Sequence, residues 1–248
     1  MDTDTAITED AELLEELETM SPEELLRWAY TEFGERAGII TSFQDTGTVM
    51  LDMANTVAPD LRVLTVDPLR LHPETYQLMD DVEQRYGITI ERFEPDPKRL
   101  QRMVQQHGEY LFFDSKAKQE FCCHVRKVEP NMRALRTVDA WITGVRRDHS
   151  DTRAETSKAA YVRYDWGTIL KLAPLADWTE EQVKDYIAEH NVPYNKLYDQ
   201  GYTSIGCRIC STPTLPHEDK RAGRWRWFNA LEAEKECGIH TNTSGGGI

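Results

Sequence analysis

Apolar runs and amphipathic segments alternate along the first half of the chain. Short runs rich in β-branched residues predict buried strands at 37–43, 61–67 and 88–94, with two more at 139–145 and 169–176. Segments with helical spacing predict helices at 48–57, 73–87 and 98–108. Strands that alternate with helices are joined by right-handed crossovers. The pattern therefore predicts an α/β fold, with an open, mostly parallel sheet flanked by helices.

Two capping boxes mark further helix starts. Ser21–Glu24 and Thr179–Gln182 each place a hydroxyl at the N-cap and Glu or Gln three residues later, and the second predicts a helix over 180–190. Residues 1–24 carry ten carboxylates and no Lys or Arg. We expect 1–20 to be a mobile acidic segment, 21–240 a single α/β domain and 241–248 a disordered tail.

Composition narrows the class of protein. The 248 residues are 40% hydrophobic and 29% charged, which is typical of a globular protein. The chain lacks a long apolar stretch and its start lacks a basic signal region, so we expect a cytoplasmic protein without a membrane span. The net charge of -14 argues against non-specific nucleic-acid binding. The local basic excess between Lys116 and Arg153 nevertheless suits a small anionic ligand.

Four of the five cysteines form two pairs, Cys122–Cys123 and Cys207–Cys210. They could be buried apolar residues, zinc ligands or iron–sulfur ligands. Adjacent thiolates reach a single zinc ion poorly, whereas a cubane cluster presents separate irons to each of them. The pattern favours an iron–sulfur cluster, with zinc as the alternative.

The remaining cysteine is Cys237, in the sequence Lys235–His240. A thiol close to a lysine and a histidine on a flexible arm could act as a nucleophile. The alternative is an exposed thiol without a role.

Three segments could hold a phosphate-like group. The loop 42–48 leads from the first strand into a helix, and 144–153 lies where open α/β sheets bind their ligands. Arg221 and Arg224 are three residues apart, so we expect them to share a helix face and grip an anion. For each arginine cluster a solvated surface face is the alternative. Trp225 and Trp227 are interpreted as packing residues.

Several motifs occur in a fixed order along the chain: VDPLRLHPETY, CCHVRKVEP, AWITGVRRDHSDTR, PLADWTEEQV, VPYNKLYDQGYTSIGCRIC, RAGRWRW and KECGIH. Together they resemble the assimilatory adenylyl-sulfate reductases of the thioredoxin-dependent sulfonucleotide reductase family, from about residue 37 to residue 240. The resemblance implies an adenine-nucleotide α-hydrolase-like fold with a C-terminal cysteine-bearing lid within 206–240. It also implies a [4Fe–4S] cluster on Cys122, Cys123, Cys207 and Cys210.

The resemblance also implies site residues. It makes Cys237 the catalytic nucleophile. The positions that match those around the phosphosulfate are Lys127, Arg153, Arg221, Arg224 and His240, and those that match nucleotide contacts are Ser42 and Gly144. Two departures from the usual pattern, at Gln44–Asp45 and at Pro68, leave the neighbouring contacts open.

The implied reaction is the reduction of adenylyl sulfate to sulfite and AMP by thioredoxin, or by a glutaredoxin-like reductant, through an S-sulfonate on Cys237. Use of the 3′-phosphorylated nucleotide, alone or in addition, is the main alternative, although enzymes specific for it generally lack the cluster cysteines. A zinc-stabilised nucleotide-binding module is an alternative of a different class. An ATP pyrophosphatase would need an SGGxDS loop, which SFQDTGT is not. The sequence leaves homo-oligomer formation open.

Overall fold

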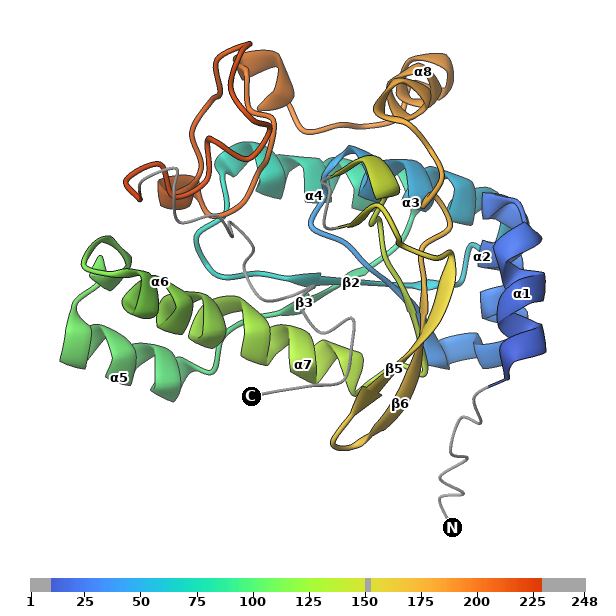
Figure 1. Cartoon of the computed structure of the whole chain (residues 1–248), viewed down its shortest axis with the longest axis horizontal. Helices are drawn as coiled ribbons and strands as arrows, with labels where there is room; N and C mark the ends of the chain where they lie inside the picture. Colours follow the sequence, from blue (N-terminus) through green and yellow to red (C-terminus); the bar gives the residue numbers. More distant parts are fainter. Residues whose placement is uncertain (1–9, 150–152, 229–248) are drawn as a thin grey trace.

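The computed structural model of the protein describes residues 10–149 and 153–228 (Figure 1). Within these residues six strands form one sheet, in the order β3-β2-β1-β4-β6-β5. The strands are β1 (Ala37–Ile40), β2 (Arg62–Val66), β3 (Ile90–Phe93), β4 (Ala140–Ile142), β5 (Ala159–Tyr164) and β6 (Gly167–Leu172). All neighbours pair in parallel except β5, which pairs antiparallel with β6 at the edge. The predicted α/β class with an open, mostly parallel sheet is confirmed.

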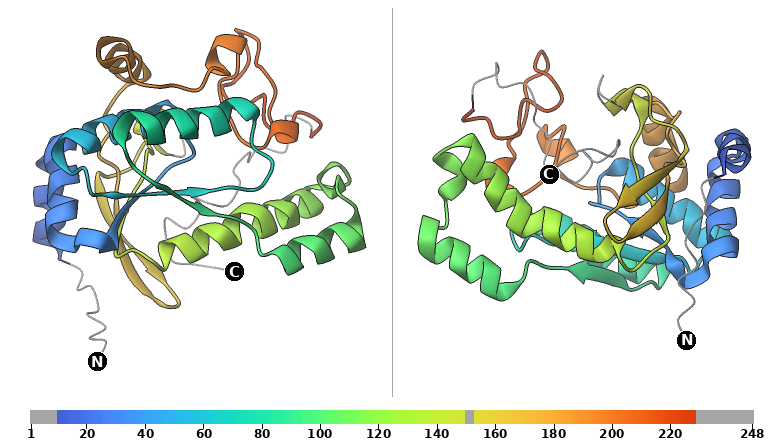
Figure 2. Two further views of the ribbon diagram at one scale, coloured as in Figure 1. Left: turned by 180° about the vertical axis from the view of Figure 1, so that it is seen from behind. Right: turned by 60° about the horizontal axis from the view of Figure 1, so that its bottom comes forward.

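Helices cover both faces of the sheet (Figures 1 and 2). One face carries α1 (Ala11–Thr19), α2 (Pro22–Phe33), α3 (Asp45–Val57), α4 (Pro73–Tyr86) and α8 (Glu180–His190). The other carries α5 (Pro97–His107), α6 (Lys116–Cys123) and α7 (Glu129–Leu135). Among the described residues no helix is both long and apolar enough to span a membrane.

The core consists of apolar side chains from both layers. Ile39 of β1 packs with Met50 of α3 and Leu78 of α4 in the larger cluster. On the opposite face Trp141 of β4 packs with Leu135 of α7. Burying each such side chain contributes about 1.5–3 kcal/mol relative to leaving it exposed. The sheet is thus fixed from both sides, and its carboxyl edge becomes a rigid base for loops.

Both predicted capping boxes are present. The Ser21 hydroxyl accepts from the Glu24 N–H at 3.2 Å, while the Glu24 carboxylate accepts from the Ser21 N–H at 2.8 Å. Thr179 and Gln182 make the same reciprocal pair at the start of α8. These bonds satisfy N–H groups that a helix start leaves unpaired. They therefore fix the residue at which each helix begins.

Two parts of the chain differ from expectation. Residues 11–19, expected to be mobile, form helix α1, because Leu17 is fully buried against the core. Strand β5, for which no strand was predicted, lies at the sheet edge and has only a partly buried pattern. Between α6 and α7 the chain makes a π-helical segment at His124–Val128, a feature that often occurs at functional sites.

Candidate functional site

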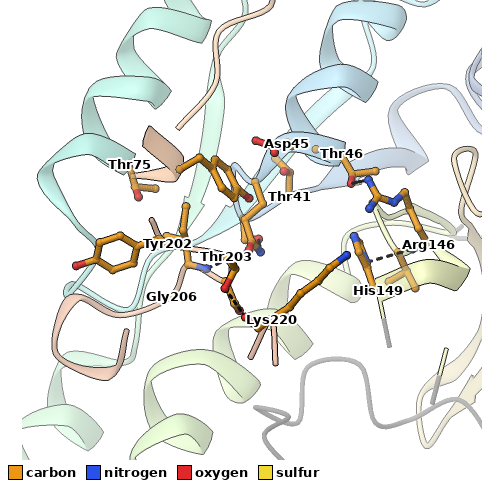
Figure 3. A pocket seen from close by; sticks show the side chains of 18 of the residues that line it. Thr41, Asp45, Thr46, Thr75, Arg146, His149, Tyr202, Thr203, Gly206 and Lys220 are labelled. Atoms are coloured by element: carbon orange, nitrogen blue, oxygen red, sulfur yellow. Dashed lines mark hydrogen bonds between the residues drawn. The ribbon is translucent and has the colours of Figure 1, made fainter. Parts of the chain in front are cut away.

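A cavity of about 660 Å³ lies at the carboxyl ends of β1 and β4, where the strand order reverses. Open α/β sheets bind ligands at this position. The six residues predicted to bind substrate all line it: Ser42, Lys127, Gly144, Arg153, Arg221 and Arg224. Figure 3 shows Arg146 and His149 on one side of the cavity and Tyr202 on the other, with Lys220 extending toward His149.

The loop after β1 forms the base of the cavity. A Cβ atom on Gly47 would lie 2.1 Å from the Thr41 hydroxyl oxygen, so only glycine allows α3 to begin this close to the strand. The Gln44 side chain donates to the Ser42 hydroxyl at 3.1 Å and accepts from the Ile205 N–H at 3.2 Å. Gln44 therefore ties this loop to the C-terminal segment.

The loop after β4 is held by Arg146, which is 3% exposed. Its guanidinium donates to the Thr46 hydroxyl at 3.2 Å and forms an ion pair with Asp148 at 2.9 Å. Arg146 therefore joins this loop to the start of α3.

His149 lies in the same loop and is held as a neutral imidazole. Its Nδ1 accepts from the Arg146 N–H at 3.3 Å and lies 3.4 Å from the Arg153 guanidinium. Both neighbours are donors, so the ring proton belongs on Nε2. Burial, together with the charges of Arg146 and Arg153, lowers the pKa of His149 to about 3. The site prediction omitted Arg146 and His149, although both lie in the strand-end segment that it singled out.

Asp45, the first residue of α3, also lines the cavity. Burial raises its pKa to about 7, against the opposing influence of Lys184 and Arg146. Its Oδ1 atom has no hydrogen-bond partner within residues 10–149 and 153–228. The site prediction omitted Asp45, although it lies in the loop 42–48 that was singled out, because its altered acidity comes from burial beneath segments distant in sequence.

The C-terminal segment closes the cavity from the other side, but Arg221 and Arg224 do not share a helix face as expected. Residues 219–224 form consecutive turns, in which Arg224 N–H donates to the Arg221 carbonyl at 2.9 Å. The backbone of Arg224 then forms an isolated antiparallel β-bridge with Ser211, which a helix would not allow. The turns, rather than helical periodicity, bring both arginines to the cavity.

Arg224 is 4% exposed and packs over the Trp225 ring at 4.7 Å. In the part of the chain that the structure describes, its Nε and Nη2 atoms have no hydrogen-bond partner. A Cβ atom on Gly206 would lie 2.4 Å from Nη2, so the guanidinium occupies the space that this glycine leaves. These donors are free to meet an anion, since unpaired buried donors are costly unless a ligand satisfies them.

A second, smaller cavity brings together the four predicted ligand cysteines, Cys122, Cys123, Cys207 and Cys210. The first two end α6, whereas Cys207 precedes the 3₁₀ turn Arg208–Cys210 and Cys210 ends it. Figure 2 shows this C-terminal segment beside α6. No three acidic, histidine or cysteine side chains are grouped to hold a single metal ion in the described ranges.

Burial and a nearby cation act in opposite directions on the acidity of these cysteines. Burial raises the pKa of Cys210 to about 12 and also raises that of Cys122. The buried Arg126 donates to the Pro68 carbonyl at 2.8 Å, whereas its Nε has no partner among the described residues. Lys127 lines this cavity as well as the larger one. Cys237 and His240 lie outside the described residues.

Comparison with known proteins shows which proteins this chain is similar to. The chain is 38% identical over 234 residues to an adenosine 5′-phosphosulfate reductase of Pseudomonas aeruginosa (strain LESB58), covering 92% of this chain and 85% of that protein. It is 44% identical over 181 residues to the adenosine 5′-phosphosulfate reductase of Burkholderia cepacia, covering 73% and 71% respectively.

A solved phosphoadenylyl-sulfate (PAPS) reductase from Candida auris, in a phosphate complex, superposes with a TM-score of 0.71 and 32% identity, covering 84% of this chain and 100% of that one. This likeness confirms the predicted adenine-nucleotide α-hydrolase-like fold. Residues 37–213 match the family described as the phosphoadenosine phosphosulfate reductase domain. The chain therefore belongs to the phosphoadenosine phosphosulfate reductase family.

Proposed function

We propose that this protein reduces adenylyl sulfate to sulfite and AMP in assimilatory sulfate reduction, with thioredoxin as the reductant. The observation that carries the proposal is the convergence of Ser42, Gly144 and four cationic side chains on one cavity beside the four cysteines. The similarity to adenosine 5′-phosphosulfate reductases over most of the chain supports the choice of substrate. The reaction would run in the cytoplasm, where thioredoxin is kept reduced.

The proposed chemistry begins with the Cys237 thiolate attacking the sulfate sulfur. A sulfur–sulfur bond forms, the bond between that sulfur and the bridging oxygen breaks, and its electron pair leaves with AMP. Negative charge grows on the departing phosphate. Arg153 and Arg224, which line the cavity, would stabilise that charge more in the transition state than in the ground state.

The second stage uses the two thiols of thioredoxin. One thiolate attacks Sγ of Cys237 and expels sulfite, which takes the electron pair of the sulfur–sulfur bond. The second thiol then resolves the mixed disulfide, leaving oxidised thioredoxin and a regenerated Cys237 thiolate. His240, close to Cys237 in sequence, would assist the nucleophile. The two electrons that produce sulfite thus come from thioredoxin.

We further propose that Cys122, Cys123, Cys207 and Cys210 hold a [4Fe–4S] cluster. Zinc would need all four sulfurs about 2.3 Å from one ion, which the adjacent pair Cys122 and Cys123 supplies poorly. A cluster spreads its ligands over separate irons. The cavity is about 10 Å³, so it would have to widen to admit the cluster.

Charge also supports an anionic group at this place. Arg126 is 5% exposed, and within the described residues no carboxylate is among the groups that act on it. A buried cation without a counter-charge is strongly unfavourable, and thiolate ligands with their cluster would supply that charge. When bound, the cluster would add negative charge beside Lys127 and the substrate cavity.

The PAPS reductase from Candida auris favours a second candidate, in which the 3′-phosphorylated nucleotide is a substrate in addition or instead. Sulfite release from each nucleotide with reduced thioredoxin distinguishes the two. Faster turnover of the 3′-phosphorylated nucleotide would overturn the choice of adenylyl sulfate.

The test of the mechanism is a single-turnover incubation of anaerobically purified protein with ³⁵S-labelled adenylyl sulfate and no thioredoxin. We expect one labelled sulfonate per active chain, mapped to Cys237 by mass spectrometry, and none in Cys237→Ser. Label on another cysteine, or none, would contradict the mechanism. Zinc without acid-labile sulfide in the same preparation would contradict the cluster.

A further inference from the structure

Helix α1 lies outside the residues that match the family, and no residue of it lines the large cavity. It packs beside β5 at the edge of the sheet (Figure 1), and Leu17 anchors it in the core. The proposed reaction gives this acidic helix no role, although the helix is packed against the sheet.

The carboxylate of Glu18 makes two contacts at once. Its Oε1 forms an ion pair with the Arg147 guanidinium at 2.5 Å, and its Oε2 accepts from the backbone N–H of Lys158 at 2.6 Å. The ion pair alone is worth little, because both side chains are more than a third exposed. The second contact is part-buried and uses a backbone N–H, so it fixes the geometry of the carboxylate more than the ion pair does.

These two partners are the ends of one loop. The chain between Arg147 and Lys158 carries His149 and Arg153, which both line the cavity. Arg147 also donates to the Thr156 carbonyl at 2.8 Å, which draws the two arms of the loop together.

The side chain of Lys158 makes a further contact with the same end of α1. The Lys158 ammonium, on a residue only 7% exposed, donates to the Met20 carbonyl at 2.9 Å and pairs with Asp177 at 3.0 Å. The C-terminal end of α1 therefore touches the loop through one side chain and one backbone carbonyl.

We propose that Glu18 is a positioning residue that presents Arg153 and His149 to the nucleotide by fixing both ends of their loop. The inference rests on the proposed function only in taking the cavity as the nucleotide site. Fixing the loop before binding lowers the conformational entropy that binding must remove. The contacts of Glu18 with Arg147 and Lys158 therefore act mainly on affinity.

The test compares Glu18→Ala, Glu18→Gln and the control Glu15→Ala in the full-length protein. Glu15 lies in the same helix and is exposed. The readouts are the Kd for AMP by calorimetry, KM and kcat for adenylyl sulfate, and the melting temperature. We expect Glu18→Ala to raise Kd and KM roughly fivefold to tenfold with kcat nearly unchanged. Glu18→Gln retains an acceptor for Lys158 and should lose less, and Glu15→Ala should match the wild type.

A double variant separates positioning from general destabilisation. If Glu18 acts through the Arg153 loop, Glu18→Ala should weaken AMP binding much less in an Arg153→Ala background than in the wild type. Equal losses in the two backgrounds, or an unchanged Kd in folded Glu18→Ala, would overturn the inference. Wild-type protein that does not bind AMP would instead contradict the proposed function.

Discussion

The two cavities share Lys127, and they differ in the partners of the cationic side chains that line them. In the large one several cations are paired with acids: Arg146 with Asp148 at 2.9 Å, and Lys184 and Lys220 both with Glu180 at 2.5 Å. In the cysteine cavity Arg70 pairs with the exposed Glu109 at 3.0 Å, whereas the buried Arg126 faces thiols and has no carboxylate partner in the described part of the chain. The first suits an anion that enters and leaves, and the second suits a resident anionic group.

The boundary between the cavities is thin. Gly206 lines the large cavity, and its neighbour Cys207 lines the small one. Arg224 lies against Gly206 and is close enough to favour the ionised form of Cys210. A substitution in either cavity should therefore alter the side chains that line the other. Three substitutions test how strongly the two cavities are coupled.

The largest effect is expected for Cys207→Ser, which removes one ligand from the cysteine cavity. We expect iron and acid-labile sulfide to be lost and sulfite production to fall to background, because a metal site with a missing ligand loses much of its binding and folding free energy. Cys237→Ser is the matched control, since it should abolish turnover yet retain iron and sulfide. Full iron content in Cys207→Ser would show that the cysteine cavity does not need its fourth ligand.

An intermediate effect is expected for Gly206→Ala on the boundary. The new Cβ would displace the Arg224 guanidinium, which is the mobile end of a long side chain. Stability should change little, whereas kcat/KM should fall about 10²-fold, because displacing a catalytic group by about 1 Å has an effect of that size. In an Arg224→Ala background the same substitution should have almost no further effect. A large loss there would mean that Gly206 acts on the cysteines and not through Arg224.

The smallest effect on activity is expected for Asp45→Asn in the large cavity, where the change concerns stability. The pKa of Asp45 is about 7 in the folded protein, against 3.8 in the unfolded chain. As pH rises from about 4 to 7, the unfolded state loses the proton first, so the free energy of unfolding falls. Asn has no such proton, and the variant should gain on the order of a few kcal/mol over the wild type at pH 8 but not at pH 4.

Thermal melts over this pH range measure the difference. Asp60→Asn, which replaces an exposed carboxylate, is the control and should show no such trend. An Asp45→Asn gain that does not grow with pH would mean that the cavity already compensates the ionised carboxylate.

Much of the fold follows from local sequence. The β-branched runs at β1, β2 and β3 and the capping box at α8 depend on neighbours within a few positions, so each element could be predicted in place. The four cysteines were identified for a similar reason, since their spacing alone restricts the groups that they can hold. Strand β5 was missed because an edge strand of a hairpin is only partly buried and its apolar pattern is weak.

The site residues divide along the same line. Gly144 and Arg153 could be expected at the cavity because they follow a strand whose carboxyl end binds ligands in this class of fold. The states of Asp45 and His149 could not be expected, because their acidity is set by burial beneath other segments. Likewise, three-residue spacing suggested a helix at Arg221 and Arg224, but the bridge to Ser211 favours turns.

The sequence by itself determined which chemical groups this protein has and the strand and helix order that carries them, because residue type and periodicity are local properties. Only the tertiary structure decided that Glu18, in the acidic N-terminal segment, contacts both ends of the loop that carries His149 and Arg153. Glu18 contacts residues 129 and 140 positions away, and no local pattern contains that information. Contacts of this range arise from the packing of the whole chain, which sets both the burial and the partners of each side chain.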